Sequence, residues 1–250
     1  MIYLDAGTTY SKIIATTVGV NDISNTSEDV ENLRKNYGKF FIKSDGGKDY
    51  YILPSAILKT DNFTKNFEIK KCCGHMGIAD ENEIIALANG SKNIIDKDST
   101  ILDLGSRDAK WIRFKDGKFH DMDWNTSCAS STGATVEMLL KFYNVSREEL
   151  SFNEEKFAVT CGIFGLEKIM DDISNGAKPV EAISKFVHGI AYNAWNFAKK
   201  PKKIYLSGGF CENKCFVDSL RYYCEVVLLG RFMLCEGLVN SDKEGELLNA

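Results

Sequence analysis

The sequence predicts an α/β fold built from two similar halves, and an internal repeat is the main reason. Leu4–Ile14 returns ninety-eight positions later as Leu102–Ile112, with Leu, Asp, Gly, Lys and Ile at matching places. Each copy has an apolar strand, an Asp at its end, a turn on Gly and a second strand. A further strand enters the Leu-Ser-Gly-Gly run at Leu206–Gly209. Two such hairpins in a mixed α/β chain indicate a duplicated fold whose two similar loops face one ligand.

The first half is expected to consist mostly of strands. Its predicted elements are strands at Ile2–Asp5, Ser11–Val18, Lys39–Lys43 and Asp49–Leu53 and a helix at Glu81–Asn89. The last two strands surround Asp45-Gly46-Gly47, a strong hairpin signal, and Gly90 ends the helix. The polar segment Asn21–Lys35 is expected to be mainly loop.

The second half begins with three strands and continues mainly with helices. The predicted strands are Ile101–Leu104, Ala109–Phe114, Phe119–Trp124 and Lys203–Leu206. The predicted helices are Thr132–Phe142, Phe164–Ser174, Val180–Ala198 and Lys214–Cys224. The third helix is a long amphipathic run that ends before Pro201, because proline cannot continue a helix.

Composition narrows the class of partner and the cellular location. The chain is 44% hydrophobic and 26% charged, with a formal net charge of −4 and no long basic run. Nucleic acid is therefore excluded as a main partner. A strand-like segment starts at the N-terminus, so no signal peptide is expected. No stretch approaches the roughly 18 apolar residues that a membrane span requires. We expect a cytoplasmic protein whose eight cysteines are mostly reduced and buried.

The repeated loops carry the residue types of a phosphate-binding site. Asp5 and Asp103 stand where a strand ends, and a carboxylate there can hold Mg²⁺, usually through water. Glycine two positions later lets the backbone approach a phosphate. The other candidate ligand-binding residues are Gly7, Thr8, Thr9, Lys12, Gly105, Ser106, Lys110, Gly208 and Gly209. An ordinary β-hairpin also uses Asp and Gly in its turn, but two copies with matched spacing favour the phosphate site.

This set of motifs resembles the actin-like ATPase superfamily, which includes sugar kinases, heat-shock chaperones and actin. The resemblance implies two ribonuclease-H-like subdomains, expected at residues 1–92 and 93–250, with the nucleotide cleft between them. It also implies that Asp5 and Asp103 organise Mg²⁺ and the attacking water. Glycines 7, 105, 208 and 209 would then line ATP or ADP.

Two cysteines precede predicted helices, which is a suitable environment for an anionic ligand. Cys128 lies in Ser127–Gly133 and Cys161 in Thr160–Phe164. A helix N-terminus stabilises a thiolate and the sulfurs of an iron–sulfur cluster alike. A [4Fe–4S] cluster needs four thiolates, which two copies of the chain would supply. From spacing alone, two buried structural cysteines remain the alternative.

From about residue 81 onward the chain is similar to the ATP-dependent activators of 2-hydroxyacyl-CoA dehydratases and to their benzoyl-CoA reductase relatives. The matching segments are Asp103–Lys110, Ser127–Gly133, Thr160–Phe164 and Gly208–Asn213. The resemblance implies a homodimeric ATPase with one [4Fe–4S] cluster, held by Cys128 and Cys161, that donates electrons to an acceptor iron–sulfur enzyme. It also makes Asn213 a candidate nucleotide ligand.

Several residues depart from the family pattern and keep two other functions open. Ser106 and Arg107 replace Gly-Gln in the second loop, which puts nucleotide gating in question. A small-molecule kinase of the same superfamily would use an Asp as base, and Asp108 is the available candidate. A non-catalytic nucleotide sensor is the other alternative. Cys72, Cys73, Cys211 and Cys215 are interpreted as structural thiols.

Overall fold

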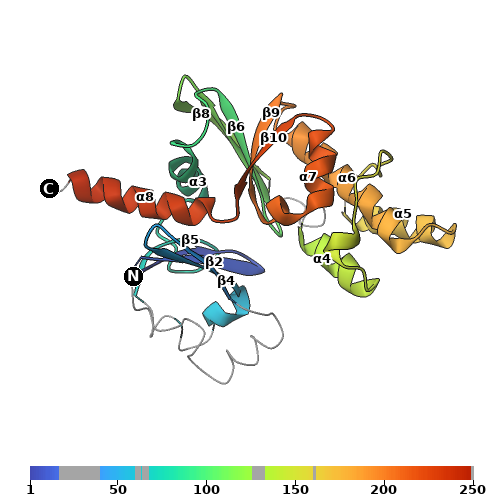
Figure 1. Ribbon diagram of the computed structural model, residues 1–250, viewed down its shortest axis with the longest axis horizontal. Coiled ribbons are helices and arrows are strands. Elements are labelled where there is room, and N and C mark those ends of the chain that lie inside the picture. The colour runs from blue at the N-terminus through green and yellow to red at the C-terminus, as the bar shows by residue number, and fades with distance from the viewer. Residues whose placement is uncertain (17–39, 60–62, 64–67, 126–132, 160–161, 249–250) are drawn as a thin grey trace. The chain divides into compact units, whose positions relative to one another are not determined.

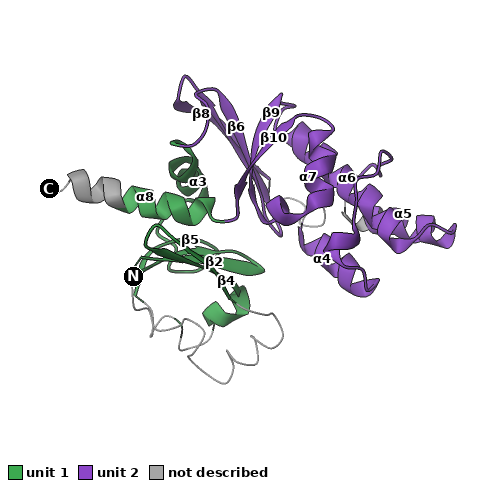
Figure 2. Cartoon of the chain, in the orientation of Figure 1, with its two compact units in different colours: residues 1–93, 232–250 green, residues 94–231 purple. Residues whose placement is uncertain are grey.

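The computed structural model describes residues 1–16, 40–59, 63, 68–125, 133–159 and 162–248. The chain divides into two compact units, one of residues 1–93 with 232–250 and one of residues 94–231 (Figure 2). Each unit has its own sheet and its own buried apolar core. Among the described residues, no helix has the length and apolar character needed to cross a lipid bilayer.

The first unit is a five-stranded sheet packed against two helices (Figure 1). Its strands are β1 (Ile2–Ala6), β2 (Tyr10–Ala15), β3 (Phe41–Asp45), β4 (Lys48–Pro54) and β5 (Ile69–Gly74), in the order β3-β4-β2-β1-β5. Only the β1–β5 pair is parallel. A 3-10 turn, η1 (Ser55–Lys59), follows β4, and the helices are α3 (Glu83–Ser91) and α8 (Met233–Leu248).

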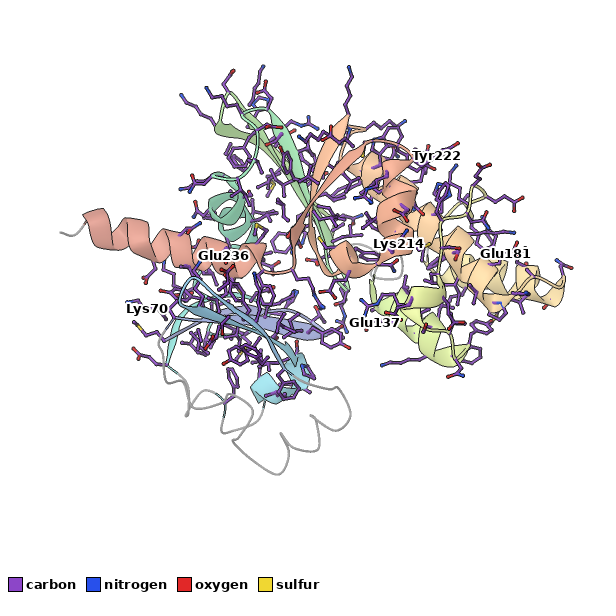
Figure 3. The ribbon with its side chains drawn as sticks, viewed as in Figure 1. Lys70, Glu137, Glu181, Lys214, Tyr222 and Glu236 are labelled. Atoms are coloured by element: carbon purple, nitrogen blue, oxygen red, sulfur yellow. The ribbon has the colours of Figure 1, made fainter. Side chains whose placement is uncertain are left out.

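The C-terminal helix α8 belongs to the first unit, whereas the expected division placed it in the second. Glu236 of α8 (labelled in Figure 3) accepts hydrogen bonds from the Tyr50 hydroxyl at 2.6 Å and the Lys48 ammonium at 2.5 Å. Tyr3 of β1 donates to Asp242 of α8 at 2.8 Å. These contacts join residues 186 to 239 positions apart, and local sequence patterns do not report such pairings.

The second unit repeats the central part of this sheet. Its strands are β6 (Ser99–Leu104), β7 (Ala109–Lys115), β8 (Lys118–Asn125), β9 (Lys203–Gly208) and β10 (Glu225–Gly230), in the order β10-β9-β6-β7-β8. Its helices are α4 (Gly133–Phe142), α5 (Gly162–Ser174), α6 (Pro179–Phe197) and α7 (Lys214–Arg221). Short 3-10 turns lie at η3 (Arg147–Glu149) and η4 (Gly209–Glu212). Helix α6 is the centre of the core, since both Phe186 and Val187 are fully buried.

The two repeated hairpins have the same register, which confirms the predicted α/β fold class with two similar halves. Asp5 is opposite Lys12 across β1 and β2, and Asp103 is opposite Lys110 across β6 and β7. The parallel neighbour also matches, because β5 pairs with β1 as β9 pairs with β6.

Most expected elements agree with the structure to within a few residues. The predicted hairpins correspond to β1–β2, β3–β4 and β6–β8, and the predicted helices to α3 through α7. Strands β5 and β10 and helix α8 were not predicted from the sequence. The expected loop at Asn21–Lys35 lies outside the described residues.

Candidate functional site

The first repeated loop holds a buried carboxylate paired with a lysine. Asp5, at the end of β1, is 4% exposed, and the Lys12 ammonium donates to its Oδ2 at 2.8 Å. The strand alternation places the two side chains on the same face, as opposite partners in the register. Because the carboxylate and the ammonium neutralise one another, this end of β1 carries a balanced ion pair.

Hydroxyl groups from η1 and β2 fix the backbone of this loop. The Ser55 hydroxyl donates to the Gly7 carbonyl at 2.6 Å and lies 2.8 Å from the Ser11 hydroxyl. The Gly7 N–H donates to the Asp5 carbonyl at 3.1 Å, and the Ser55 N–H donates to the Thr9 carbonyl at 2.9 Å. A side chain at Gly7 would overlap the Tyr10 carbonyl, so this tight turn requires glycine. Both loop threonines, at positions 8 and 9, are half-buried.

The second loop surrounds its carboxylate with a larger polar network. Asp103 is also 4% exposed, and the Ser207 hydroxyl of β9 donates to its Oδ2 at 2.6 Å. Lys110 lies 3.9 Å from Asp103 but 3.3 Å from Asp108. The Trp124 indole N–H donates to Asp108 at 2.8 Å, and its ring lies beneath the Lys110 ammonium. One buried cation therefore serves two carboxylates.

Helix α4 fixes the backbone of the second loop. The N–H groups of Gly133 and Ala134, at the start of α4, donate to the carbonyls of Gly105 and Ser106 at 3.3 and 3.0 Å. The Gly105 N–H donates to the Asp108 carbonyl at 3.0 Å. First-turn N–H groups have no partner within their own helix, and here the loop carbonyls satisfy two of them. Ser106 is half-buried and Arg107 is exposed.

The glycine turn after β9 has a counterpart that sequence reasoning missed. Gly208 and Gly74 occupy equivalent register positions beside Leu104 and Ala6, with φ of 91° and 97°. At both positions a side chain would overlap the carbonyl of the neighbouring strand. Such a conformation is essentially restricted to glycine. The sequence did hold a signal for Gly74. It stands two residues after Cys72, just as Gly208 stands two residues after Leu206.

The next two predicted ligand residues differ in their surroundings. A side chain at Gly209 would enter open space, so packing within the chain does not require glycine there. A ligand that approaches the backbone closely would require it. Asn213 is 4% exposed, and its carboxamide oxygen accepts from the Phe216 N–H at 3.0 Å, which caps α7. The structure thus gives Asn213 a capping role, and its predicted nucleotide contact stays a prediction.

Cys128 and Cys161 lie outside the described residues, next to the starts of α4 and α5 at Gly133 and Gly162. Over the described part of the chain, no group of three or more His, Cys, Asp or Glu side chains is arranged to hold a metal ion. The other six cysteines are free thiols. Burial raises the pKa of Cys72 and Cys211 to about 12 and that of Cys215 and Cys224 to about 11.

The duplicated sheet with an aspartate hairpin in each half defines an actin-like ATPase fold. The activator of 2-hydroxyisocaproyl-CoA dehydratase from Clostridium difficile, solved with bound ADPNP, has this fold with a TM-score of 0.70 and 18% identity. The alignment covers 100% of this chain and 97% of that one. Component A of the Acidaminococcus fermentans (R)-2-hydroxyglutaryl-CoA dehydratase has a TM-score of 0.69 at 17% identity, over 96% of each chain.

The chain belongs to the BadF/BadG/BcrA/BcrD ATPase family, whose sequence profile matches residues 64–229. It is 25% identical over 161 residues to the 2-hydroxyisocaproyl-CoA dehydratase activator of Clostridioides difficile, covering 59% of this chain and 60% of the relative. It is 24% identical over 148 residues to the (R)-2-hydroxyglutaryl-CoA dehydratase activating ATPase of Acidaminococcus fermentans, covering 55% and 57%. The sequence match thus spans less than two thirds of these curated relatives.

Proposed function

We propose that the chain hydrolyses ATP and, through a [4Fe–4S] cluster shared by two copies, donates single electrons to an enzyme of the 2-hydroxyacyl-CoA dehydratase type. The family and the names of the curated relatives support the activator role. One structural observation carries the coupling between nucleotide and cluster. The N-terminal N–H groups of α4, the helix that follows Cys128, donate to the carbonyls of the second loop.

Each loop offers chemistry suited to nucleotide phosphates and Mg²⁺. Asp5 and Asp103 are strand-end carboxylates that would hold Mg²⁺ through its water shell. Thr8, Thr9 and the loop N–H groups would donate to phosphate oxygens. Asp103 would accept a hydrogen bond from the attacking water, while the Ser207 hydroxyl at 2.6 Å holds its other oxygen in place.

The surroundings of Asp108 favour hydrolysis over transfer to a substrate hydroxyl. A kinase base must be able to accept a proton from its substrate. Asp108 instead accepts from Trp124 and pairs with the buried Lys110, both through its Oδ2, so that oxygen already has partners within the chain. We therefore assign Asp108 to the support of Lys110 and of the second loop.

Cys128 and Cys161 of two copies would provide the four thiolates that a [4Fe–4S] cluster needs. When bound, the cluster supplies one-electron transfer. The chain would hold it beside two helix N-termini, whose N–H groups favour negative charge. A change in the carbonyls of Gly105 and Ser106 on nucleotide binding would be passed to α4 through the hydrogen bonds of its first turn. Differential affinity of ATP for the two arrangements would drive the change.

Anaerobic reconstitution followed by iron and sulfide analysis tests the proposal. We expect about four iron and four sulfide per two chains, and loss of both in Cys128→Ala and in Cys161→Ala. Cys224→Ala removes a buried thiol between α7 and β10 and should keep the full iron content. ATP turnover by a chain that never binds iron would contradict the electron-donor role. Phosphate transfer to a sugar or amino sugar would identify a kinase instead, and tight ATP binding with negligible turnover would identify a sensor.

A further inference from the structure

Arg107 is the exposed cation of the second repeated loop. It lies in the turn that joins β6 to β7, and it is exposed whereas its neighbours Ser106 and Asp108 are half-buried. Over the described part of the chain, no group forms an ion pair or a hydrogen bond with its guanidinium. A guanidinium carries a permanent positive charge and presents its N–H donors in a planar fork that matches phosphate oxygens. Arg107 is therefore a candidate ligand for a phosphate group.

The charges of the two loops show what Arg107 adds. In the first loop one aspartate pairs with one lysine at 2.8 Å, so their charges cancel. The second loop has two carboxylates, Asp103 and Asp108, but only the ammonium of Lys110 lies between them. Without a further cation, this loop would present an excess of negative charge to the negatively charged phosphates of a nucleotide. Arg107 removes that excess.

Lys110 is already used within the chain. It is 3% exposed, and its ammonium lies 3.3 Å from Asp108 and 3.9 Å from Asp103. The same ammonium lies 5.1 Å from the centre of the Trp124 ring. Movement of Lys110 toward a phosphate would leave buried carboxylate charge without its cation, which is strongly unfavourable. Arg107 can bind a phosphate without breaking such a pair.

The backbone on both sides of Arg107 is fixed. The Gly105 N–H donates to the Asp108 carbonyl at 3.0 Å, which places Ser106 and Arg107 at the two central positions of a tight turn. The first turn of α4 donates to the carbonyls of Gly105 and Ser106. A site on a fixed backbone holds its ligand in a better defined geometry than a site on a free loop. The tip of this hairpin therefore presents the guanidinium from a defined position.

The internal repeat shows that this cation belongs to one loop only. Counted from the aspartate, Thr9 of the first loop stands where Arg107 stands in the second. The two loops thus offer different donors at the same position, a neutral hydroxyl and a charged guanidinium. The family pattern has Gln there, so the charge distinguishes this chain.

We propose that Arg107 is a catalytic residue that binds the terminal phosphate of ATP and stabilises the charge on it during hydrolysis. The inference rests on the proposed function, because it takes the second loop as a phosphate loop. In hydrolysis the oxygen of water bonds to the γ-phosphorus. The bond from that phosphorus to the β–γ bridging oxygen breaks, ADP leaves with the electron pair, and Asp103 accepts the proton. Charge on the γ-phosphate oxygens is then stabilised by the guanidinium.

The first test measures nucleotide binding without turnover, on the full chain without iron. Titration calorimetry with Mg·ADPNP and with Mg·ADP gives the preference of the chain for a γ-phosphate. We expect Arg107→Gln to reduce this preference about tenfold, the effect of one hydrogen bond to a charged group. The loss should lie in the binding of Mg·ADPNP, whereas Mg·ADP should bind as before. Equal weakening of both nucleotides, or of neither, would overturn the proposal.

The second test measures phosphate release. Arg107→Gln should lower kcat by about 10²–10³-fold, the usual cost of one donor that stabilises transition-state charge, with a smaller change in KM. Arg107→Lys keeps the charge without the planar fork and should have an intermediate rate. Guanidinium ion, added below concentrations that unfold the chain, should restore part of the rate of Arg107→Ala, and NaCl at the same ionic strength should not. A higher KM with unchanged kcat contradicts the catalytic role.

A matched control separates this role from a general effect of lost surface charge. Arg221→Gln removes an exposed arginine of α7 that pairs with Asp218, and should change neither nucleotide binding nor phosphate release. The midpoint of urea unfolding should be the same in all variants. A chain that holds no iron but shows the effects at Arg107 refutes the electron donor and supports this inference. Full iron content with an unchanged Arg107→Gln variant refutes this inference alone.

Discussion

The two repeated loops share a register but differ in what holds them. Hydroxyls of Ser55 and Ser11 hold the first loop, whereas the first turn of α4 holds the second. Both loops are proposed to bind the nucleotide. The difference indicates that duplication kept the aspartate, the lysine and the turn, and diverged in the surroundings. Carbonyls of the first loop are bonded to Ser55 at the start of the short η1, whereas those of the second are bonded to the start of the α-helix α4. Because α4 follows Cys128, the second loop is the better candidate for transmitting a nucleotide signal.

The carboxylates themselves are paired differently. Asp5 has its own lysine at 2.8 Å, while Asp103 has a serine hydroxyl at 2.6 Å and shares Lys110 with Asp108. We assign the metal ion to Asp5, a strand-end carboxylate that can bind the water shell of Mg²⁺. One held by a hydroxyl, with its cation further away, is better suited to accept a proton from water. Matched substitutions at Asp5 and Asp103 test whether the two carboxylates have these different roles.

The largest effect is expected from Asp103→Asn, which should lower kcat for ATP hydrolysis by about 10²–10⁴-fold, the usual contribution of a positioned base. Asp5→Asn should mainly raise the concentration of Mg·ATP needed for half-maximal rate. Phosphate release measured over a range of ATP and Mg²⁺ concentrations separates the two. Asp45→Asn, in the exposed turn of β3–β4, is the control and should leave both parameters unchanged. Equal losses of kcat at Asp5 and Asp103 would contradict the division.

The next largest effect is on the free energy of unfolding when Lys110 or Lys12 is replaced. Lys110→Met removes the cation shared by the buried Asp103 and the half-buried Asp108 and should destabilise the second unit by about 3–5 kcal/mol. Lys12→Met leaves one such carboxylate, and we expect a cost of about 1–3 kcal/mol. Urea unfolding followed by tryptophan fluorescence reports the second unit, because Trp111, Trp124 and Trp195 all lie within residues 94–231. Hydrogen exchange of β1 and β2 reports the first. A larger loss at Lys12 than at Lys110 would refute the shared-cation interpretation.

The same comparison explains which parts of the site could be predicted from the sequence. Asp5 and Lys12 were each selected from the sequence because a repeated spacing is a local signal, but their ion pair across β1 and β2 comes from the structure. The contacts that distinguish the loops are not local. Ser207 meets Asp103 across 104 positions, and Ser55 meets Gly7 across 48. Their partners are set by which strands become neighbours in the sheet, and a single sequence does not encode this as a pattern.

The fold followed the same rule. Hairpins and amphipathic helices were predicted from their turns and periodicity, whereas the place of α8 in the first unit depends on Glu236 and Asp242 meeting residues near the N-terminus. The division predicted from the sequence has a single boundary, near residue 92. No local pattern indicates that residues 232–250 pack with the first unit. The roles of Cys128 and Cys161 come from the family resemblance alone, because both residues lie outside the described part of the chain. These roles remain predictions.

The glycine turns after β5 and β9 offer a test of their structural equivalence. Gly74→Ala and Gly208→Ala should each destabilise the chain by about 2–4 kcal/mol, from backbone strain and overlap with the neighbouring carbonyl. The two losses should be similar, each confined to its own unit in the assays above. Gly209→Ala is the matched control. Its side chain enters open space, so stability should stay within about 0.5 kcal/mol while ATP affinity falls. A stable Gly74→Ala variant would show that the two turns are not equivalent.

The smallest effect, and the sharpest test of the comparison, exchanges the residues beside the two aspartates. Asp5 has Cys73 as its parallel neighbour where Asp103 has Ser207. Ser207→Cys replaces a strong donor by a weak one and should reduce kcat about tenfold, since a hydrogen bond to a charged group is worth about 1.5–3 kcal/mol. Ser207→Thr keeps the hydroxyl and should retain the rate.

The reciprocal change, Cys73→Ser, gives Asp5 a donor it does not need, because Lys12 already pairs with it. The buried Cys73 thiol, whose pKa is raised by burial first and by Asp5 second, stays neutral and contributes little to the charge of the loop. Steady-state hydrolysis should therefore change less than about twofold, well below the tenfold effect of one strong hydrogen bond. If Cys73→Ser and Ser207→Cys reduce kcat equally, the two aspartates act alike, and the asymmetry of the loops is confined to the helix that holds the second one.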